Sequence, residues 1–471
     1  MTTPVQEEKK YLTLPRKLAY GSGDFGANFF YMLVSAFVML YLTNAVGLNA
    51  GIAGTLMMVS KILDGILDII FGKLVDNTHS KMGKARPWMF WSGFPLALCL
   101  ILLFAVPTSM PMVAQYTYFF IVYVAANSVF YTANNIAYGT MSALITKNGS
   151  ERVQLGTFRY VFAVTASILV STITTILVTS LGGGATGWRT VAIIYAIVML
   201  VFSCAASLVC KEVPETEAEL AESKAQNEVK ENKTLVGLIK IVLSNRYYLI
   251  MLAIALLLYI NTGLGSAVGV YYCQYVLGNA ALLGVISMSS LVMIVGLIFN
   301  PFLVKKYGMY KVNLISYILT SILAVGVMIT AYMGSLAGIV IFSFLRSITM
   351  APLFGSMNAL IAEIAGYTYR TRKVHAEGMM FSCSTVGVKV GGGVGSAICG
   401  WLLAAAGFVG TATTQTAGVL GVIKFGFGAL PVVFTILMAV CLWAQRVTQA
   451  NTDWDAEQGA PESADVESHA G

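Results

Sequence analysis

The sequence predicts an all-α integral membrane protein with twelve transmembrane helices, and three observations carry this prediction. Hydrophobic residues make up 57% of the 471-residue chain and charged residues only 11%, where soluble domains carry about 25%. Twelve apolar runs are long enough to span a bilayer, and the longest polar interval separates six runs from six. The seven cysteines lack metal-ligand spacing and are expected to pack as small apolar residues without disulfides.

The expected spans follow one another along nearly the whole chain. A helix needs about 20 residues to cross the hydrocarbon core, so the longer runs are expected to tilt or to extend into the membrane interface. The 45 glycines suit close packing between such helices. The spans cover residues 18–43, 50–75, 87–107, 112–145, 153–181, 188–210, 245–277, 282–304, 311–332, 336–362, 376–408 and 423–447.

Basic residues gather in every second connection between the spans. The other connections hold a single basic residue, Arg189. We expect the protein to lie in a plasma membrane, where the positive-inside rule predicts that both termini are cytoplasmic. The N-terminus lacks the apolar segment of a signal peptide, so no cleavage is expected. The basic connections carry Lys9, Lys10, Arg16, Lys17, Lys73, Lys81, Lys84, Arg86, Lys147, Arg152, Lys305, Lys306, Lys311, Arg370, Arg372 and Lys373.

The spans divide into two halves of six helices each. Two such halves around a cavity at the membrane midplane make up the major-facilitator architecture. The tail lacks apolar periodicity and is rich in acidic residues, so we expect it to be disordered. The expected segments are a cytoplasmic N-terminal segment at 1–17, a first half at 18–210, a cytoplasmic middle loop at 211–244, a second half at 245–447 and an acidic cytoplasmic tail at 448–471.

Two aspartates lie one helical turn apart in the second apolar span. Asp64 and Asp68 share a helix face with Lys61, because residues three and four apart are neighbours on a helix. An ionised side chain inside the bilayer is costly and usually functional. The three residues therefore predict a cation-binding or proton-carrying site for ion-coupled transport. The alternative is that one aspartate only pairs with Lys61 to hold the helix in place.

Several spaced motifs resemble the glycoside–pentoside–hexuronide:cation symporters. The resemblance covers residues 15–445 and is carried by the stretch from Lys17 to Asn28, the Asp64 and Asp68 pair, the stretch from Gly83 to Trp88, and Tyr131 to Gly139. It implies a symporter that moves a glycoside inward with a cation by alternating access, with the sugar, the cation and the lipid bilayer as partners.

The resemblance implies no bond cleavage and no cofactor. We expect a monomer that binds no nucleic acid. A membrane enzyme is disfavoured, because the sequence offers no nucleophile–base set and no metal cluster. A sugar sensor without turnover remains the alternative from another class of protein.

In this family the two carboxylates of the second helix form the cation site, which the resemblance assigns to Asp64 and Asp68. Thr132 matches a hydroxyl that helps to bind sodium in the melibiose permease. Lys389 matches the lysine of helix eleven that links the sugar and cation sites, and Lys61 is a second candidate for coupling. The alternative for each lysine is that it only neutralises the aspartates. Leu67 stands where the sodium-using relative has an asparagine. Leucine offers no oxygen ligand, so protons are favoured over sodium.

Asn28 and Asn135 stand where the melibiose and lactose members carry sugar-binding aspartates. Their neutrality leaves the positive charges of Lys389 and Arg159 less opposed, so both are expected to bind substrate, with a gate role as the alternative for Arg159. The chain also resembles the glucuronide and acidic-sugar transporters more than the melibiose permease. We therefore expect a glucuronide, hexuronide or other acidic sugar. Neutral disaccharides, oligosaccharides or pentosides remain the alternative, with the asparagines then acting as hydrogen bonds between helices.

Aromatic residues add two candidates for the substrate site, Tyr138 and Phe354, because an aromatic plane can stack on a sugar face. The alternative to sugar binding is that each ring packs against other side chains or lies at the lipid interface. The resemblance also implies a cytoplasmic gate, formed by Arg152, Glu363 and Glu377.

Overall fold

The structure is a computed structural model that describes residues 10–78, 80–213, 243–372, 377–412 and 414–459, and regular structure in these ranges is helical throughout. The first six spans are α1 (Leu14–Met32), continued by η1 (Leu33–Phe37), α2 (Val38–Leu40) and η2 (Tyr41–Val46); α3 (Ala50–Asp76); α4 (Arg86–Leu103); α5 (Met112–Val124), η3 (Ala125–Tyr131) and α6 (Thr132–Leu144); α7 (Gly149–Ser180); and α8 (Gly184–Val209).

The second half repeats this count of spans. Its helices are α11 (Arg246–Tyr275); α12 (Leu282–Ser287) with α13 (Ser289–Tyr307); α14 (Met309–Met333); α15 (Leu336–Arg372); α16 (Glu377–Ala405); and α17 (Ala417–Lys424), η4 (Phe425–Ala429) and α18 (Leu430–Ala444), followed by α19 (Val447–Gly459). In the described ranges, eleven helical segments have the length and apolar composition to cross a membrane, and α3 completes the twelve expected spans.

Asparagine side chains fix where several spans begin. Asn49 caps α3 by accepting hydrogen bonds from the backbone N–H groups of Gly51 and Ile52. Asn148 caps α7 and Asn245 caps α11 in the same way. These bonds satisfy amide groups that have no partner within the helix, which matters most where lipid replaces water.

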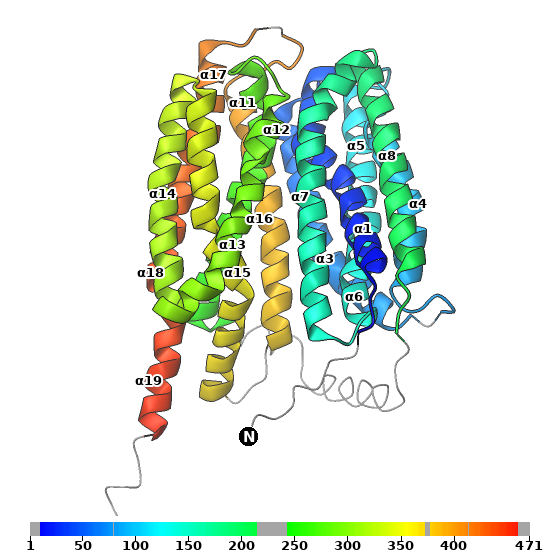
Figure 1. Ribbon diagram of the computed structural model, residues 1–471. Helices are drawn as coiled ribbons and strands as arrows, with labels where there is room; N and C mark the ends of the chain where they lie inside the picture. The colour runs from blue at the N-terminus through cyan, green and yellow to red at the C-terminus, as the bar shows by residue number, and fades with distance from the viewer. Residues whose placement is uncertain (1–9, 79, 214–242, 373–376, 413, 460–471) are drawn as a thin grey trace, which may run out of the picture.

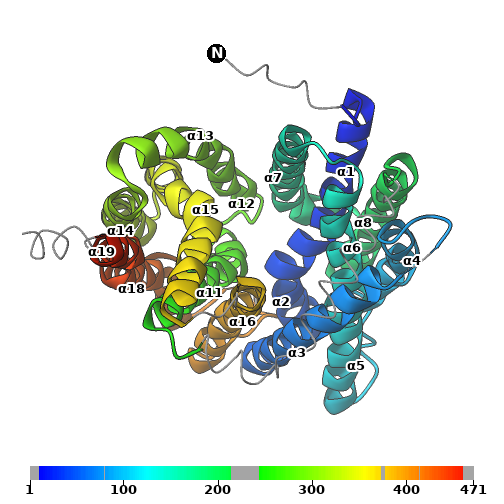
Figure 2. The ribbon, with the colours of Figure 1, turned by 90° about the horizontal axis from the view of Figure 1, so that it is seen from below.

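The two halves form two bundles that stand side by side (Figure 1). We call the end of the molecule where α1 begins and α19 ends the terminal face, and the opposite end the distal face. Helices α3 and α16 pack against each other between the halves, and α7 packs against α12 (Figure 2). The expected all-α fold with two six-helix halves is confirmed.

The hydrophobic cores show which faces of the halves meet. One cluster of buried residues draws on both halves and includes Phe37 and Tyr271. A second cluster, with Tyr248, belongs to the C-terminal half alone, and a third, with Met141, belongs to the N-terminal half alone. Residues of the two separate clusters lie towards the terminal face. The halves are therefore joined at the distal face and have independent cores at the terminal face.

Polar contacts also close the distal face. The hydroxyls of Thr43 and Tyr271 lie 2.9 Å apart, and the Asn44 amide donates to the Tyr275 hydroxyl over 2.7 Å. Backbones approach closely here as well, because a Cβ atom on Gly284 of α12 would collide with the Thr172 side chain of α7. This conformation therefore depends on a small residue at position 284.

The expected disorder of the tail from residue 448 is wrong for its first part, which forms α19. Hydrogen bonds to α15 order this helix: the Thr448 hydroxyl donates to Glu363 Oε2 over 2.6 Å, and Arg370 donates to Asn451. A search for apolar periodicity misses a helix held by polar side chains. Residues 1–9, most of the middle loop (214–242) and residues 460–471 lie outside the described residues.

Replacing Gly284 with leucine is expected to hold the distal face open, because the side chain needs the space that Thr172 occupies. Spin labels on the distal ends of α7 and α11 should then report longer distances than in the wild type. The matched control is Gly156→Leu on α7, where no atom lies within 4 Å of the added Cβ. Identical distance distributions in both variants would contradict the assignment.

Candidate functional site

A cluster of charged side chains joins the two halves in the middle of the bundle. Asp64 and Asp68 project from α3 and Lys389 projects from α16. The Lys389 ammonium lies 3.0 Å from Asp64 Oδ1 and 2.5 Å from Asp68 Oδ1. Asp64 is only 2% exposed, whereas the Asp68 side chain is 15% exposed. Lys389 therefore contacts both carboxylates, and together with Lys61, which also pairs with Asp64, it balances two negative charges that lipid cannot solvate.

A π-helical turn in the fourth span, η3, brings Asn127 and Thr132 to the same cluster. The segment η3 ends just before Thr132, whose hydroxyl donates to Asp64 Oδ1 and also lies 3.1 Å from the Asn127 carbonyl oxygen. The Lys61 ammonium lies 3.5 Å from Asp64 Oδ2 and 3.4 Å from Asn127 Oδ1. Such turns are frequent at functional sites, because the extra residue re-aims the side chains that follow.

Glycine allows α3 and α16 to approach each other closely beside the charged cluster. A Cβ atom on Gly393 of α16 would lie 2.6 Å from the Lys61 Cβ atom of α3. Close packing of backbones through glycine is a common way to join helices in lipid. With glycine at this level of α16, the side chain that extends from α16 to both aspartates of α3 is that of Lys389.

A cavity of about 180 Å³ opens beside the cluster. Both halves line it: Asp64, Lys61 and Asn135 come from the N-terminal half, and Lys389 and Tyr259 come from the C-terminal half. Four of these five side chains carry a charge or a hydroxyl, and the fifth is an amide. This mixture suits a polar ligand that needs several hydrogen bonds to orient it.

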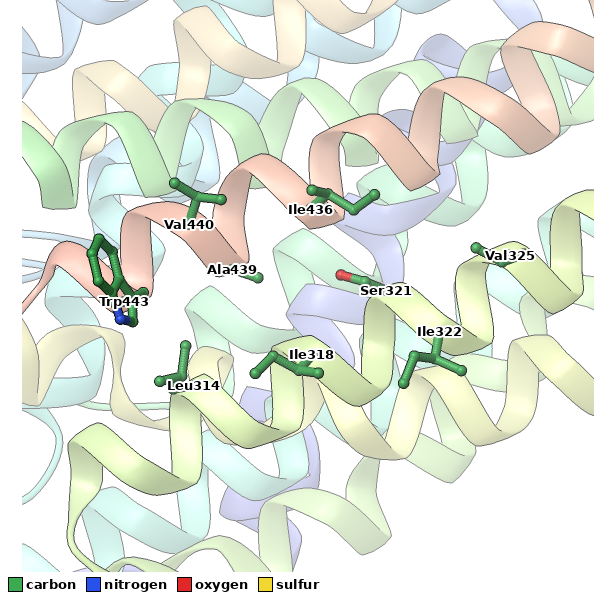
Figure 3. Close-up of a pocket in the computed structure, with 9 residues that line it drawn as sticks. All are labelled: Leu314, Ile318, Ser321, Ile322, Val325, Ile436, Ala439, Val440 and Trp443. Atoms are coloured by element: carbon green, nitrogen blue, oxygen red, sulfur yellow. The ribbon is translucent and has the colours of Figure 1, made fainter.

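A second cavity, of about 500 Å³, has a different character (Figure 3). It is a groove on the outside of the C-terminal half, between α14 and α18, and Ser321 provides the one hydroxyl among its lining side chains. An apolar groove on a membrane-spanning helix pair suits lipid chains rather than a sugar. Its lining residues are Leu314, Ile318, Ser321, Ile322, Val325, Ile436, Ala439, Val440 and Trp443.

A second ionic pair lies within the N-terminal half. Arg159 Nε donates to Asp24 Oδ2 over 3.1 Å, and the Arg159 guanidinium stacks 4.9 Å from the centre of the Tyr138 ring. The other face of Tyr138 stacks on Tyr20 at 4.6 Å. Both faces of the Tyr138 ring are therefore covered in this conformation, and neither is available to a sugar.

These pairs correct the charge argument made from the sequence. Lys389 and Arg159 are not left without opposing charge, because aspartates contact both of them. Asn28 donates to the Asp24 carbonyl oxygen over 2.8 Å and accepts from Ser167 over 3.4 Å, so it supports this pair. Asn135 is one of the residues that line the cavity.

The remaining predicted residues lie away from the cavity. Phe354 packs against the core of the C-terminal half. Arg152 donates to the Thr146 and Ala143 carbonyl oxygens within the N-terminal half, and Glu363 bonds to Thr448 within the C-terminal half. The Glu377 side chain lies outside the described residues. Of the predicted gate residues whose side chains are described, Arg152 and Glu363 therefore each bond within their own half in this conformation.

Two residues of the site were missed by sequence reasoning. Asp24 lies in the Gly-Asp-Phe-Gly stretch of the first span, so the signal that marks Asp64, an acid among apolar residues, was present there too. Asn127 gave no comparable signal. Its contact with Lys61 follows from η3, and a shift of helix type is not visible in apolar periodicity.

The family described as MFS/sugar transport protein matches residues 19–449. The chain belongs to this family. An isoprimeverose transporter of Lactiplantibacillus pentosus is 28% identical over 457 residues, which cover 93% of this chain and 90% of the relative. The inner membrane symporter YicJ and a glucuronide carrier protein homolog, both of Escherichia coli, are 25% and 24% identical, each with 92% of both chains covered.

Solved structures show the same fold at low identity. The nucleoside transporter NupG matches with a TM-score of 0.62 at 13% identity, covering 92% of this chain and 98% of that chain. A D-xylose-proton symporter matches with a TM-score of 0.61 at 15% identity, covering 90% and 96%. The predicted membership of the glycoside–pentoside–hexuronide:cation symporters is confirmed, and the protein is a multi-pass membrane sugar symporter of the major facilitator superfamily.

Proposed function

We propose that the protein imports a glycoside together with a cation, and that Asp64 and Asp68 bind the cation with help from Thr132. The observation that supports this most is the ammonium of Lys389 between the two carboxylates. It joins α16 of one half to α3 of the other, so a cation that takes its place changes the contact between the halves. Such a contact couples ion binding to alternating access.

We favour a proton as the coupling ion. Sodium needs several oxygen ligands, and Leu67 supplies none beside the aspartates. The Lys389 ammonium also lies between the carboxylates, at the point where ligands to a metal ion would converge. A proton requires no shell of ligands, and two close carboxylates share protons as a unit. After the proton has left, the Lys389 ammonium then takes the place of the coupling ion between the two aspartates.

In this proposal the terminal face is cytoplasmic, in keeping with the positive-inside rule. The conformation is then inward-facing, with a closed periplasmic side and with Arg152, Glu363 and Glu377 forming the gate only when the terminal face closes. Arg152 and Glu363 bond within their own halves, which is what an open gate requires.

We favour an acidic sugar as the substrate. Asn28 and Asn135 add no negative charge at the two positions where the melibiose and lactose members carry aspartates. The similarity to a glucuronide carrier protein homolog supports this class of substrate, whereas the similarity to an isoprimeverose transporter supports the alternative of another glycoside.

Replacing Asp68 with asparagine should abolish uphill accumulation while sugar exchange across the membrane continues, because the cation site is lost and the sugar contacts remain. Uptake and counterflow in proteoliposomes measure the two activities. Lys73→Gln, which removes an exposed charge from the end of the same helix, serves as the control. Normal accumulation by the Asp68 variant would overturn the assignment. A sugar sensor without turnover would show no counterflow even in the wild type.

Sugar uptake is expected to follow an imposed pH gradient and to persist in sodium-free buffer. The reason is that protonation of the Asp64 and Asp68 pair needs no oxygen from position 67. Uptake is measured at fixed membrane potential with each ion gradient imposed separately. Strict dependence on sodium at constant pH would show that the proton assignment is wrong.

Asn28→Asp or Asn135→Asp should weaken competition by acidic sugars about ten- to hundredfold, since a charge-assisted contact is worth ~1.5–3 kcal/mol and a like charge opposes it. Competition against uptake of a labelled sugar measures this, with the matching neutral glycoside as the internal control. The substrate class is overturned if neutral glycosides compete better than their uronides in the wild type.

A further inference from the structure

The groove between α14 and α18 leaves apolar side chains uncovered by the rest of the protein (Figure 3). The two helices pack against each other, yet most of the residues that line the groove are exposed. A contiguous apolar surface of this kind marks a place where lipid or another protein binds. The exposed lining residues are Ile318, Ile322, Ile436, Val440 and Trp443.

The groove has the length of one membrane leaflet. Its lining on α14 runs from Leu314 to Val325, eleven residues further along, which is about 16 Å at the helical rise. Half of the hydrocarbon core of a bilayer is about 15 Å thick. Trp443 lies one residue before the end of α18, so this end of the groove is at the terminal face. The Tyr310 hydroxyl donates to the Trp443 carbonyl oxygen over 3.1 Å and joins the two helices there.

Basic side chains lie beside the groove at the same end. The Arg446 guanidinium lies 5.6 Å from the centre of the Trp443 ring, which lines the groove. Lys311 lies one turn before Leu314, on the same face of α14. Both basic side chains are exposed, and neither forms a hydrogen bond or a salt bridge with the residues that the structure describes.

The neighbouring helices offer no negative charge to these cations. The sequences of α13, α14 and α18 contain no aspartate or glutamate, and Lys305 and Lys306 add two positive charges at the end of α13. The next acidic residue along the chain, Asp453, lies two turns beyond Arg446 on α19, which packs against α15. The end of the groove at the terminal face therefore carries a local excess of positive charge, and such clusters beside a membrane span attract anionic lipid headgroups.

We propose that the groove is a binding site for an anionic phospholipid of the leaflet at the terminal face. One acyl chain lies between α14 and α18, and Arg446 and Lys311 bind the phosphate. Trp443 stands at the boundary between the two parts, where tryptophan is enriched in membrane proteins. A helix of another protein fits less well, because it would need a groove across both leaflets. The site is independent of the sugar and of the coupling ion.

The first measurement compares two lipids that differ in headgroup charge. Purified, delipidated protein is titrated with phosphatidylglycerol or with phosphatidylcholine of the same acyl chains, and bound lipid is counted by native mass spectrometry while thermal unfolding is followed. Phosphatidylglycerol should bind saturably and raise the unfolding temperature, and added salt should weaken its binding. Dibrominated phosphatidylglycerol should also quench Trp443, measured as the difference between the wild type and Trp443→Phe.

Variants then separate the headgroup contact from the acyl-chain contact. Arg446→Gln and Lys311→Gln should each weaken phosphatidylglycerol about fivefold, because each removes one positive charge beside the headgroup. Lys73→Gln removes an exposed lysine from the terminal end of α3 and should have no effect. Ala439→Phe should exclude the lipid by filling the groove, whereas Leu437→Phe enlarges an exposed side chain of α18 outside the lining and should not.

Three results would overturn the proposal. Equal binding of both lipids would show that the headgroup charge is not recognised. Unchanged affinity in both charge variants, or in Ala439→Phe, would place the lipid elsewhere on the protein. If Ala439→Phe does not fold, quenching of Trp443 decides, and equal quenching by dibrominated phosphatidylglycerol and phosphatidylcholine counts against the site. A protein that shows no counterflow with any glycoside would contradict the proposed function while leaving these lipid measurements unaffected.

Discussion

The contact of Lys389 with Asp64 and Asp68 is the constraint on which the rest of the molecule depends. Charges inside a bilayer must be neutralised locally, since lipid cannot solvate them. The contact of two aspartates of one half with a lysine of the other ties the halves together at mid-height, and Lys61 supplies the second positive charge. The glycines of α16, the capped start of α3 and the π-helical turn before Thr132 all serve to bring these groups within bonding distance.

The distribution of hydrophobic cores explains how such a tie coexists with movement. Each half keeps its own core towards the terminal face, whereas the distal face draws its core from both halves. Opening the terminal face therefore leaves each bundle intact. Opening the distal face instead separates residues such as Thr43 and Tyr271, whose contact is polar and easily exchanged for water. This distribution of cores favours movement of one half against the other at the level of the charged cluster, as the proposed alternating access requires.

Much of the fold and of the charged cluster could be predicted from the sequence, because apolar runs mark the spans of a membrane protein and charged residues within those runs mark its functional sites. The spans, the two halves and the Asp64, Asp68 and Lys389 cluster follow from those signals. Side-chain partners do not. Nothing in the sequence says that Arg159 meets Asp24, that Tyr138 is covered on both faces, or that Asn127 reaches Lys61, since these contacts depend on helix rotation and on η3. Helix α19 was not predicted, because hydrogen bonds between polar side chains hold it rather than an apolar face.

The contact of α19 with α15 bears on how the terminal face moves in the proposed transport cycle. Glu363 uses its carboxylate for Thr448, and the Asn451 amide donates to the Glu363 carbonyl oxygen on the same turn of α15. A carboxylate has several acceptor positions, so Glu363 can hold α19 through Thr448 and still face a cation of the opposite half in the proposed gate. If the terminal face closes through Glu363, as proposed, α19 therefore moves together with α15, and its position reports whether this face is open or closed.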